Sequence, residues 1–353
     1  MTTPTLHSGA SPTLAGRFSP ARLAWVLGVL FVLTAMVFVA GAMLGAEPIG
    51  LRRALEDPES IDARILFGLR LPRLVLALIA GAGLSAAGAA YQGLLRNPLA
   101  DPFVLGVSGG AALGGTLALA AGSLLPPLGM SWLVGGTLVT SAAFVGAAGA
   151  TLLAFAAGRS GGRLDPTRTL LAGVVFNSFA AALITLLKTA VSPEKAQELL
   201  FWLTGTLGYE SWSTLLAAGI ATLLTILFLA RQGHALNVLT LGDDSAAALG
   251  IDVARVRLVV FAAASLAVAV AVSLTGMVAF VGLVVPHMMR LSLGPDLRLL
   301  IPASALGGAA FLLAADLGAR LLFIPLGTEL PAGALTALTG GPFFLMLLRR
   351  KLL

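Results

Sequence analysis

Few residues of this chain have side chains suited to covalent or metal chemistry. Among 353 residues there are three histidines and no cysteine, and the three lysines are Lys188, Lys195 and Lys351. A phosphate-binding P-loop needs Gly-x-x-x-x-Gly-Lys-Ser/Thr, because backbone amides and the lysine hold the phosphates together. None of the lysines follows a glycine. We therefore expect that this polypeptide does not hydrolyse ATP by itself and has no catalytic residue, metal site or cofactor of its own.

Ionisable residues are also scarce in the predicted helices. A carrier driven by a proton or sodium gradient usually keeps such residues in mid-membrane. Here Asp316 and Arg320 lie near a predicted helix end, and His287 follows Pro286 close to Arg290. His287 is either a ligand or proton relay, or a group that caps or hydrogen-bonds a helix terminus near the cytoplasmic interface, and we favour the second interpretation.

The composition indicates that lipid covers most of the surface. Apolar residues make up 58% of the chain and charged residues 11%, whereas average proteins have about 45–50% and about 25%. A soluble surface cannot be covered with so few charges. The 22 basic and 16 acidic residues are dispersed along the chain, which argues against nucleic acid as a partner. We expect an all-α polytopic membrane protein.

Charge-free stretches mark the spans, because an apolar helix needs about 20 residues to cross the hydrocarbon core. Pro126, Pro127 and Gly129 divide one long stretch into two helices, and Thr275-Gly276 divides another. The sequence therefore predicts ten transmembrane helices. The stretches are 23–46, 74–95, 102–158, 169–187, 211–230, 258–289, 299–315 and 330–348.

An even number of crossings places both termini on the same side. Cytoplasmic loops carry an excess of Lys and Arg, and a topology with both termini in the cytoplasm puts fourteen basic residues inside and eight outside. The segment 47–73 is an exception, with five arginines on the outer side. We expect a disordered cytoplasmic tail over 1–20 and a single transmembrane domain over 21–353.

The most informative cytoplasmic segment is LNVLTLGDDSAAALGIDVARVR, residues 236–257. Asp243 and Asp244 open a short helix whose N-terminal dipole favours negative charge. Gly250 follows Leu249 as a left-handed stop. The result is a capped helix of about two turns, which is too short and too polar to cross the membrane. It is either an ordinary loop helix or a helix that docks in a groove of a cytoplasmic partner.

Several motifs, in order over roughly residues 20–350, resemble the FecCD-type (BtuC-like) permeases of ABC importers. That family takes up iron–siderophore complexes, haem and cobalamin. One departure lies at Leu297, where many relatives have His. The matching runs are RLPR at 70–73, GAGLSAAGAAYQGLLRNPLADPFVLGVSGGAALG at 81–114, LLAG at 170–173, LNVLTLGDDSAAALGI at 236–251, GMVAFVGLVVPHMMRL at 276–291, LLIPASALGGAAFLLAADLGAR at 299–320 and ELPAGALTALTGGPFFLMLL at 329–348.

The resemblance implies an assembly in the bacterial inner membrane. The chain would pair as a homodimer within membrane lipid, bind two cytoplasmic ABC ATPase subunits that carry ATP and magnesium, and receive its substrate from a periplasmic or lipid-anchored binding protein. The substrate would be a ferric siderophore, haem or a corrinoid, and the motifs do not select among them. An ion-gradient-driven secondary carrier of a hydrophobic solute is the alternative.

The resemblance also implies roles for individual residues. External arginines at such positions in this family pair with glutamates of the binding protein, and an interfacial arginine whose charge reaches toward water is the alternative for each. A buried polar pair explains the two pathway residues equally well. The implied sets are Arg70, Arg73 and Arg320 for binding-protein docking; Leu241, Gly242, Asp243, Asp244, Ala247, Leu249 and Gly250 for ATPase coupling; Asp165, Pro166 and Thr167 for the cytoplasmic gate; and Asn177 and Ser178 for the translocation pathway.

Overall fold

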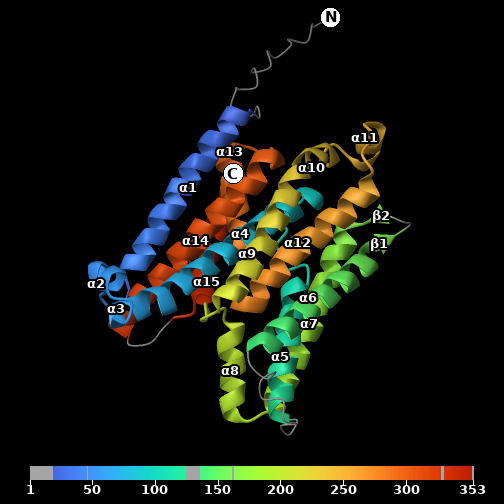
Figure 1. Ribbon diagram of the computed structural model, residues 1–353. Coiled ribbons are helices and arrows are strands. Elements are labelled where there is room, and N and C mark those ends of the chain that lie inside the picture. Colours follow the sequence, from blue (N-terminus) through green and yellow to red (C-terminus); the bar gives the residue numbers. More distant parts are fainter. Residues whose placement is uncertain (1–18, 46, 125–135, 161–162, 327–329, 352–353) are drawn as a thin grey trace, which may run out of the picture.

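The protein is a bundle of long helices, shown in Figure 1. The computed structural model describes residues 19–45, 47–124, 136–160, 163–326 and 330–351. The elements in chain order are α1 (Pro20–Met43), α2 (Leu51–Glu56), α3 (Ile61–Ala63), the π-helical segment η2 (Arg64–Arg70), α4 (Leu71–Leu94), α5 (Val107–Leu124), α6 (Gly136–Gly158), β1 (Arg159–Ser160), β2 (Arg163–Leu164), α7 (Pro166–Ala190), α8 (Pro193–Leu203), α9 (Trp212–Arg231), α10 (Gly233–Leu239), α11 (Asp243–Ala248), α12 (Val253–Thr275), α13 (Val281–Leu293), α14 (Leu297–Leu326) and α15 (Ala332–Lys351).

Seven helices in the described part of the chain are long and apolar enough to cross a membrane, so the protein is a multi-pass membrane protein. Three shorter apolar helices lie within α5, α13 and α15. These ten elements overlap the ten helices expected from the eight charge-free stretches. The division at Thr275-Gly276 is confirmed, because α12 ends at Thr275 and Gly276 has φ 66°. The division at Pro126, Pro127 and Gly129 lies outside the described residues, as do positions 1–18 of the expected tail.

Helix α4 is the centre of the bundle. In its most apolar stretch 89% of residues are buried, against 11% for α1 and 11% for α7. Small residues allow this close packing. A Cβ on Gly81 would lie 2.3 Å from the carbonyl oxygen of Gly308 in α14, and one on Gly88 would meet the carbonyl oxygen of Gly282 in α13. Glycines therefore allow α4 to pack closely against α13 and α14.

Polar residues at the helix starts fix where the helices begin. Ser19 accepts a hydrogen bond from the backbone N–H of Arg22 at 3.1 Å, and Asp252 accepts one from Arg255 at 3.0 Å. Such caps satisfy backbone donors that have no partner within the helix. Both helices begin earlier than the charge-free stretches, because capping tolerates the charged residues of a first turn.

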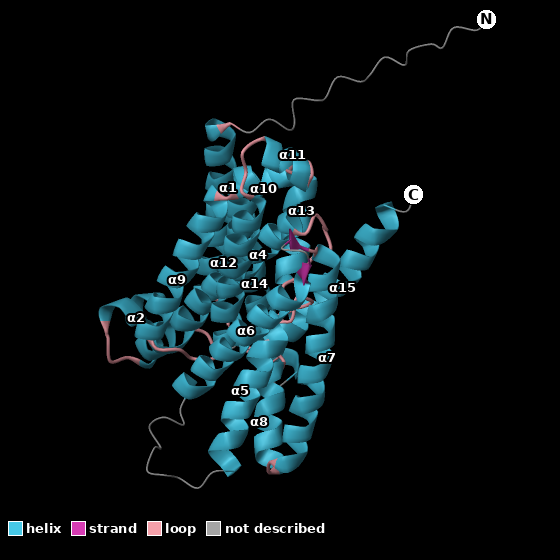
Figure 2. Cartoon of the chain, turned by 90° about the vertical axis from the view of Figure 1, so that its right-hand side faces the viewer, coloured by secondary structure: helices cyan, strands magenta, loops and turns pink. Residues whose placement is uncertain are grey.

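The bundle has two distinct ends, and Figures 1 and 2 agree on their contents. The start of α1, the ends of α13 and α15, and the short elements α10, α11, β1 and β2 lie toward one end. The short elements α2 and α3 and the helix α8 lie toward the opposite end. We name these the coupling end and the outer end, after the roles that the resemblance implies for them. The start of α1 and the end of α15 share an end, as an even number of crossings requires.

Candidate functional site

The segment singled out in the sequence forms a compact projection at the coupling end. Helix α11 begins after Gly242, which has φ 114°, and is followed by Gly250 with φ 81°. Both values lie in the region that favours glycine. The short helix and its glycine stop are thus confirmed, whereas the need for glycine at 242 was not recognised from the sequence.

The tip of this projection is apolar and open. Leu241 and Leu249 are 66% and 64% exposed. Ala247 is exposed on the same helix, and only Ala246 of α11 is buried. Leucines exposed on both sides of a six-residue helix, beyond the apolar bundle, are the type of surface that another protein covers.

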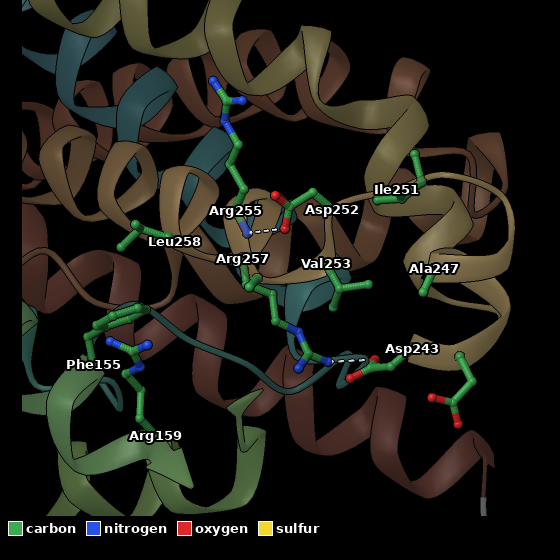
Figure 3. A pocket seen from close by; sticks show the side chains of 12 residues that line it. Phe155, Arg159, Asp243, Ala247, Ile251, Asp252, Val253, Arg255, Arg257 and Leu258 are labelled. Atoms are coloured by element: carbon green, nitrogen blue, oxygen red, sulfur yellow. Dashed lines mark hydrogen bonds and ion pairs between the residues drawn. The ribbon is translucent and has the colours of Figure 1, made fainter. Parts of the chain in front are cut away.

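Asp243 attaches the projection to the bundle. Its Oδ1 accepts a hydrogen bond from Arg257 Nη2 of α12 at 2.8 Å and another from Arg96 Nη2, just after α4. Arg257 is buried, whereas the Asp243 side chain is 23% exposed. Figure 3 shows the Arg257 pair at the edge of a cleft of about 530 Å³. Phe155 and Arg159 of the α6–β1 junction form the opposite wall.

Helix α10 is fixed to the start of α14 through one side chain. Asn237 donates to Asp296 at 2.7 Å and accepts from the backbone N–H of Leu297 at 2.9 Å. Burial raises the pKa of Asp296, but hydrogen bonds from Arg298 and Asn237 outweigh it and leave the pKa below its ordinary value. Leu297, the residue that departs from the family pattern, is itself buried and packs on Gly93.

The expected gate residues shape the start of α7. Asp165 caps the helix by accepting from the backbone N–H groups of Thr167 at 2.8 Å and Arg168 at 3.1 Å. Pro166 occupies the first helical turn, where its missing N–H does no harm. The ribbon of β1 and β2 precedes this cap and pairs Arg159 with Leu164. The three residues thus join the ribbon to α7, and their gating role stays a prediction.

The two expected pathway residues have different surroundings. Asn177 of α7 donates from Nδ2 to the carbonyl oxygen of Phe103 at 2.6 Å and so holds the loop between α4 and α5. Ser178 is exposed and its hydroxyl donates within the helix to Val174 at 3.1 Å. Only Ser178 presents its side chain to the outside of this single chain.

The loop between α4 and α5 contains a buried carboxyl. Asp101 is 8% exposed and accepts a hydrogen bond from the backbone N–H of Phe103 at 3.0 Å. Burial raises the pKa of Asp101 to about 6, although the hydrogen bond from Phe103 opposes the shift. The sequence alone gave no sign that this aspartate would be buried.

The three arginines expected to dock a binding protein lie together but are largely buried. Arg70, Arg73 and Arg320 are 7%, 7% and 9% exposed. Arg73 Nε donates to Asp316 at 2.7 Å, and Arg320 Nε lies 3.0 Å from the same carboxylate. Arg70 Nη1 donates to the carbonyl oxygens of Ala42 and Met43 at the end of α1. Neither interpretation from the sequence anticipated these internal partners.

His287 lies in the body of α13, so it does not cap its own helix. Its expected interaction with another helix terminus stays a prediction. Its ring is 5% exposed and packs edge-on against Phe344 of α15, with ring centroids 6.4 Å apart.

Comparisons with known proteins agree with this architecture. The chain is 38% identical over 341 residues to the hemin transport system permease protein HmuU of Yersinia pestis, covering 95% of this chain and 98% of the relative. It is 37% identical to the vitamin B12 import system permease protein BtuC of Vibrio vulnificus, with 94% of each covered.

A solved structure described as an inward-facing conformation of a metal-chelate type ABC transporter superposes with a TM-score of 0.79 at 30% identity. The superposition covers 93% of this chain and 99% of the chain in the solved structure. Residues 11–350 match the FecCD transport family. A match over nearly the whole length, together with the same helical architecture, establishes that the chain belongs to the FecCD transport family.

Proposed function

We propose that this chain is the permease subunit of an ABC importer that moves a bulky metal chelate across the bacterial inner membrane. The observation that carries the proposal is the projection at the coupling end, with Leu241 and Leu249 exposed at its tip. A chain without a P-loop needs a partner to supply ATP hydrolysis. The projection offers the surface on which such an ATPase subunit docks.

The relatives support the substrate class. Their names specify hemin, vitamin B12 and, for FhuB of Bacillus subtilis, iron(3+)-hydroxamate. FhuB is 38% identical over 316 residues, covering 87% of this chain and 78% of the relative. These substrates share size and a chelated metal, so we assign the class of ferric siderophore, haem or corrinoid rather than one member.

We infer a homodimer of ten-helix subunits with both termini in the cytoplasm. The exposed face of α7 supports dimerisation, because Leu171, Val175 and Phe179 are 62%, 61% and 58% exposed on one chain. Together with Asn177 and Ser178 this helix would line a pathway between the two copies. ATP and magnesium would lie on two separate ATPase subunits at the coupling end.

A substrate-binding protein would dock at the outer end. Arg70, Arg73 and Arg320 come together there, and their small exposed area would meet acidic side chains of that protein. Asp316 holds two of the guanidinium groups in place. Preorganised charges of this kind fix the register of a complex and speed its formation.

Uptake into proteoliposomes tests the proposal. The permease is reconstituted with an ABC ATPase and a binding protein, and haemin, cobalamin and a ferric hydroxamate are offered in turn. We expect ATP-dependent uptake of one of them that persists when an uncoupler collapses the ion gradient. Uptake that stops when the uncoupler is added and does not depend on ATP would instead support a secondary carrier. The control is an ATPase whose P-loop lysine is replaced by alanine.

A further inference from the structure

The turn that ends α4 has an unusual residue at its left-handed position. The backbone N–H of Arg96 donates to Gly93 at 3.3 Å and that of Asn97 donates to Gln92 at 3.1 Å. This pattern is a Schellman motif, whose left-handed residue is usually glycine. Here Arg96 occupies that position with φ 50°. A side chain is strained there, so its contacts must compensate for the strain.

The Arg96 side chain makes one contact that joins distant parts of the chain. It donates to Asp243 Oδ1 of α11, 147 positions along the sequence. The same oxygen accepts from Arg257 of α12 at 2.8 Å. One carboxylate therefore joins the end of α4, the start of α12 and the helix that carries the apolar tip.

Helix α11 has few buried side chains. The helix has six residues and one buried side chain, Ala246, and a helix this short does not persist by itself. Glycines with positive φ flank it at Gly242 and Gly250. The orientation of α11 therefore depends strongly on Asp243.

Arg96 also leads directly into a segment that touches α7. In the loop after it, the carbonyl oxygen of Phe103 accepts a hydrogen bond from Asn177 Nδ2 at 2.6 Å. Further along, Gly106 and Gly173 are so close that a Cβ on Gly106 would lie 3.3 Å from the Gly173 Cα. A displacement of Arg96 therefore acts on α4 and, through this loop, on α7, which with α1 is the least buried of the long apolar helices in the described bundle.

We propose that the Arg96–Asp243 ion pair is the positioning contact through which movement of α11 reaches α4 and α7. The inference rests on the proposed function, in which the ATPase moves α11. Arginine is then needed at position 96 for its ion pair, in spite of the strained backbone. If the turn alone mattered, glycine would fit this position better.

Arg96→Gly separates the role of Arg96 in positioning α11 from its role in the turn that ends α4. Glycine relieves the strain, so we expect an unfolding midpoint equal to or above that of the wild type and retained binding of the ATPase subunit. Chelate transported per ATP hydrolysed should fall by about fivefold or more, the usual range of coupling between sites. Arg96→Gln should lower this ratio as well, whereas Arg231→Gln, at an exposed arginine ending α9, should not.

Two results would overturn the inference in this assay. The first is an unchanged ratio of transport to ATP hydrolysis in Arg96→Gly. The second is a loss of stability and ATPase binding in proportion to the loss of transport, which would mean that Arg96 only supports the fold. A wild-type complex that takes up no chelate would contradict the proposed function instead.

A measurement on the permease alone tests the contact without any partner. The chain has no cysteine, so spin labels at Ala248→Cys and Leu99→Cys report the distance from α11 to the loop after α4. Arg96→Gly and Asp243→Asn should each broaden the distance distribution. The double variant should add nothing to the effect of Asp243→Asn, because that change already removes the ion pair with Arg96, together with the one to Arg257. Unchanged distributions, or effects that add, would refute the link even if uptake is confirmed.

Discussion

Arg73 Nε donates to Asp316 across 2.7 Å, although the two residues are 243 positions apart. Asp316 is fully buried, and Arg320 shares its carboxylate from one helical turn away. The same Arg320 donates to Gly41 at the end of α1 at 3.0 Å. This cluster therefore holds α1, α4 and α14 together at the outer end.

Asp316→Asn should destabilise the fold strongly. Removing one member of a buried ionic cluster leaves the remaining charges uncompensated, which costs about 3–5 kcal/mol. The free energy of unfolding, from denaturant titration in detergent, measures the loss. Glu56→Gln is the control, because Glu56 pairs with Arg52 at 2.8 Å on an exposed helix and such pairs contribute about 0–1 kcal/mol. Equal effects of the two variants would contradict the role given to Asp316.

The outer arginines should affect binding-protein association in proportion to the charge removed. We expect graded losses for Arg70→Ala, Arg73→Ala and Arg320→Ala, and severe loss when all three become Glu. Added salt should slow association, because exposed charges are screened beyond about 8 Å. Surface plasmon resonance with the binding protein measures both rates.

These arginines also support the fold, so the experiment needs a second readout. ATPase binding at the opposite end reports whether the triple variant is folded. Retained ATPase binding with lost association confirms docking. Retained ATPase binding with an unchanged association rate would leave the arginines with their internal role alone.

The sequence predicted the helices well because their signal is local. Charge-free stretches of about 20 residues have few alternatives to a membrane-spanning helix, and the glycine pattern of the coupling segment encodes its turns. The amphipathic α8 was missed because Glu194, Lys195 and Glu198 made it resemble a loop. Its start depends on Ser192, which accepts from the backbone N–H of Lys195 at 3.4 Å.

The pairing of charges could not be predicted from one sequence. Asp316 stands four positions before Arg320, which hints at a helical pair, but nothing local connects it to Arg73. Asp243 likewise looked like a helix-dipole residue, and its two arginine partners come from positions 147 and 14 residues away. Such contacts are products of tertiary packing, so a single sequence does not show them. The roles expected for these residues in docking and coupling stay predictions.

Gly88→Ala should disrupt the centre of the bundle. A Cβ there would lie 1.8 Å from the carbonyl oxygen of Gly282, so α4 and α13 would have to separate. Overpacking of this kind costs about 1–3 kcal/mol or more. Gly149→Ala is the matched control, because a Cβ on Gly149 meets nothing within 4 Å. Size-exclusion profiles and unfolding midpoints compare the two variants. Similar stability of both would show that α4 and α13 can separate at little cost in stability.

Asp101 should make stability depend on pH. Unfolded aspartate loses its proton near pH 4 (about 3.9), whereas burial in the folded protein raises the pKa of Asp101 to about 6. The folded state therefore binds more protons between these values, and stability falls as the pH rises through that window. The loss is complete above about pH 6, where the buried carboxylate is charged.

Asp101→Asn removes this dependence. The amide oxygen can still accept from Phe103, and no charge is buried. Unfolding midpoints at pH 5 and pH 7.5 should differ less in the variant than in the wild type, with the variant more stable at pH 7.5. If the unfolding midpoint changes between these pH values by the same amount in the wild type and in the variant, the assignment is contradicted.

Ala247→Trp should block ATPase docking without unfolding the permease. Ala247 is exposed beside the cleft on a helix with one buried residue, so the new ring projects into the partner instead of into the bundle. Gly250→Val acts differently, because a β-branched residue disfavours the φ of 81° found there. We expect both variants to insert into the membrane and dimerise, to lose ATPase co-purification and to lose uptake. Ala21→Trp, at an exposed position in the first turn of α1, should keep all four properties. If Ala247→Trp and Gly250→Val retain wild-type ATPase binding and uptake, the partner docks elsewhere on the coupling end and α11 is an ordinary loop helix.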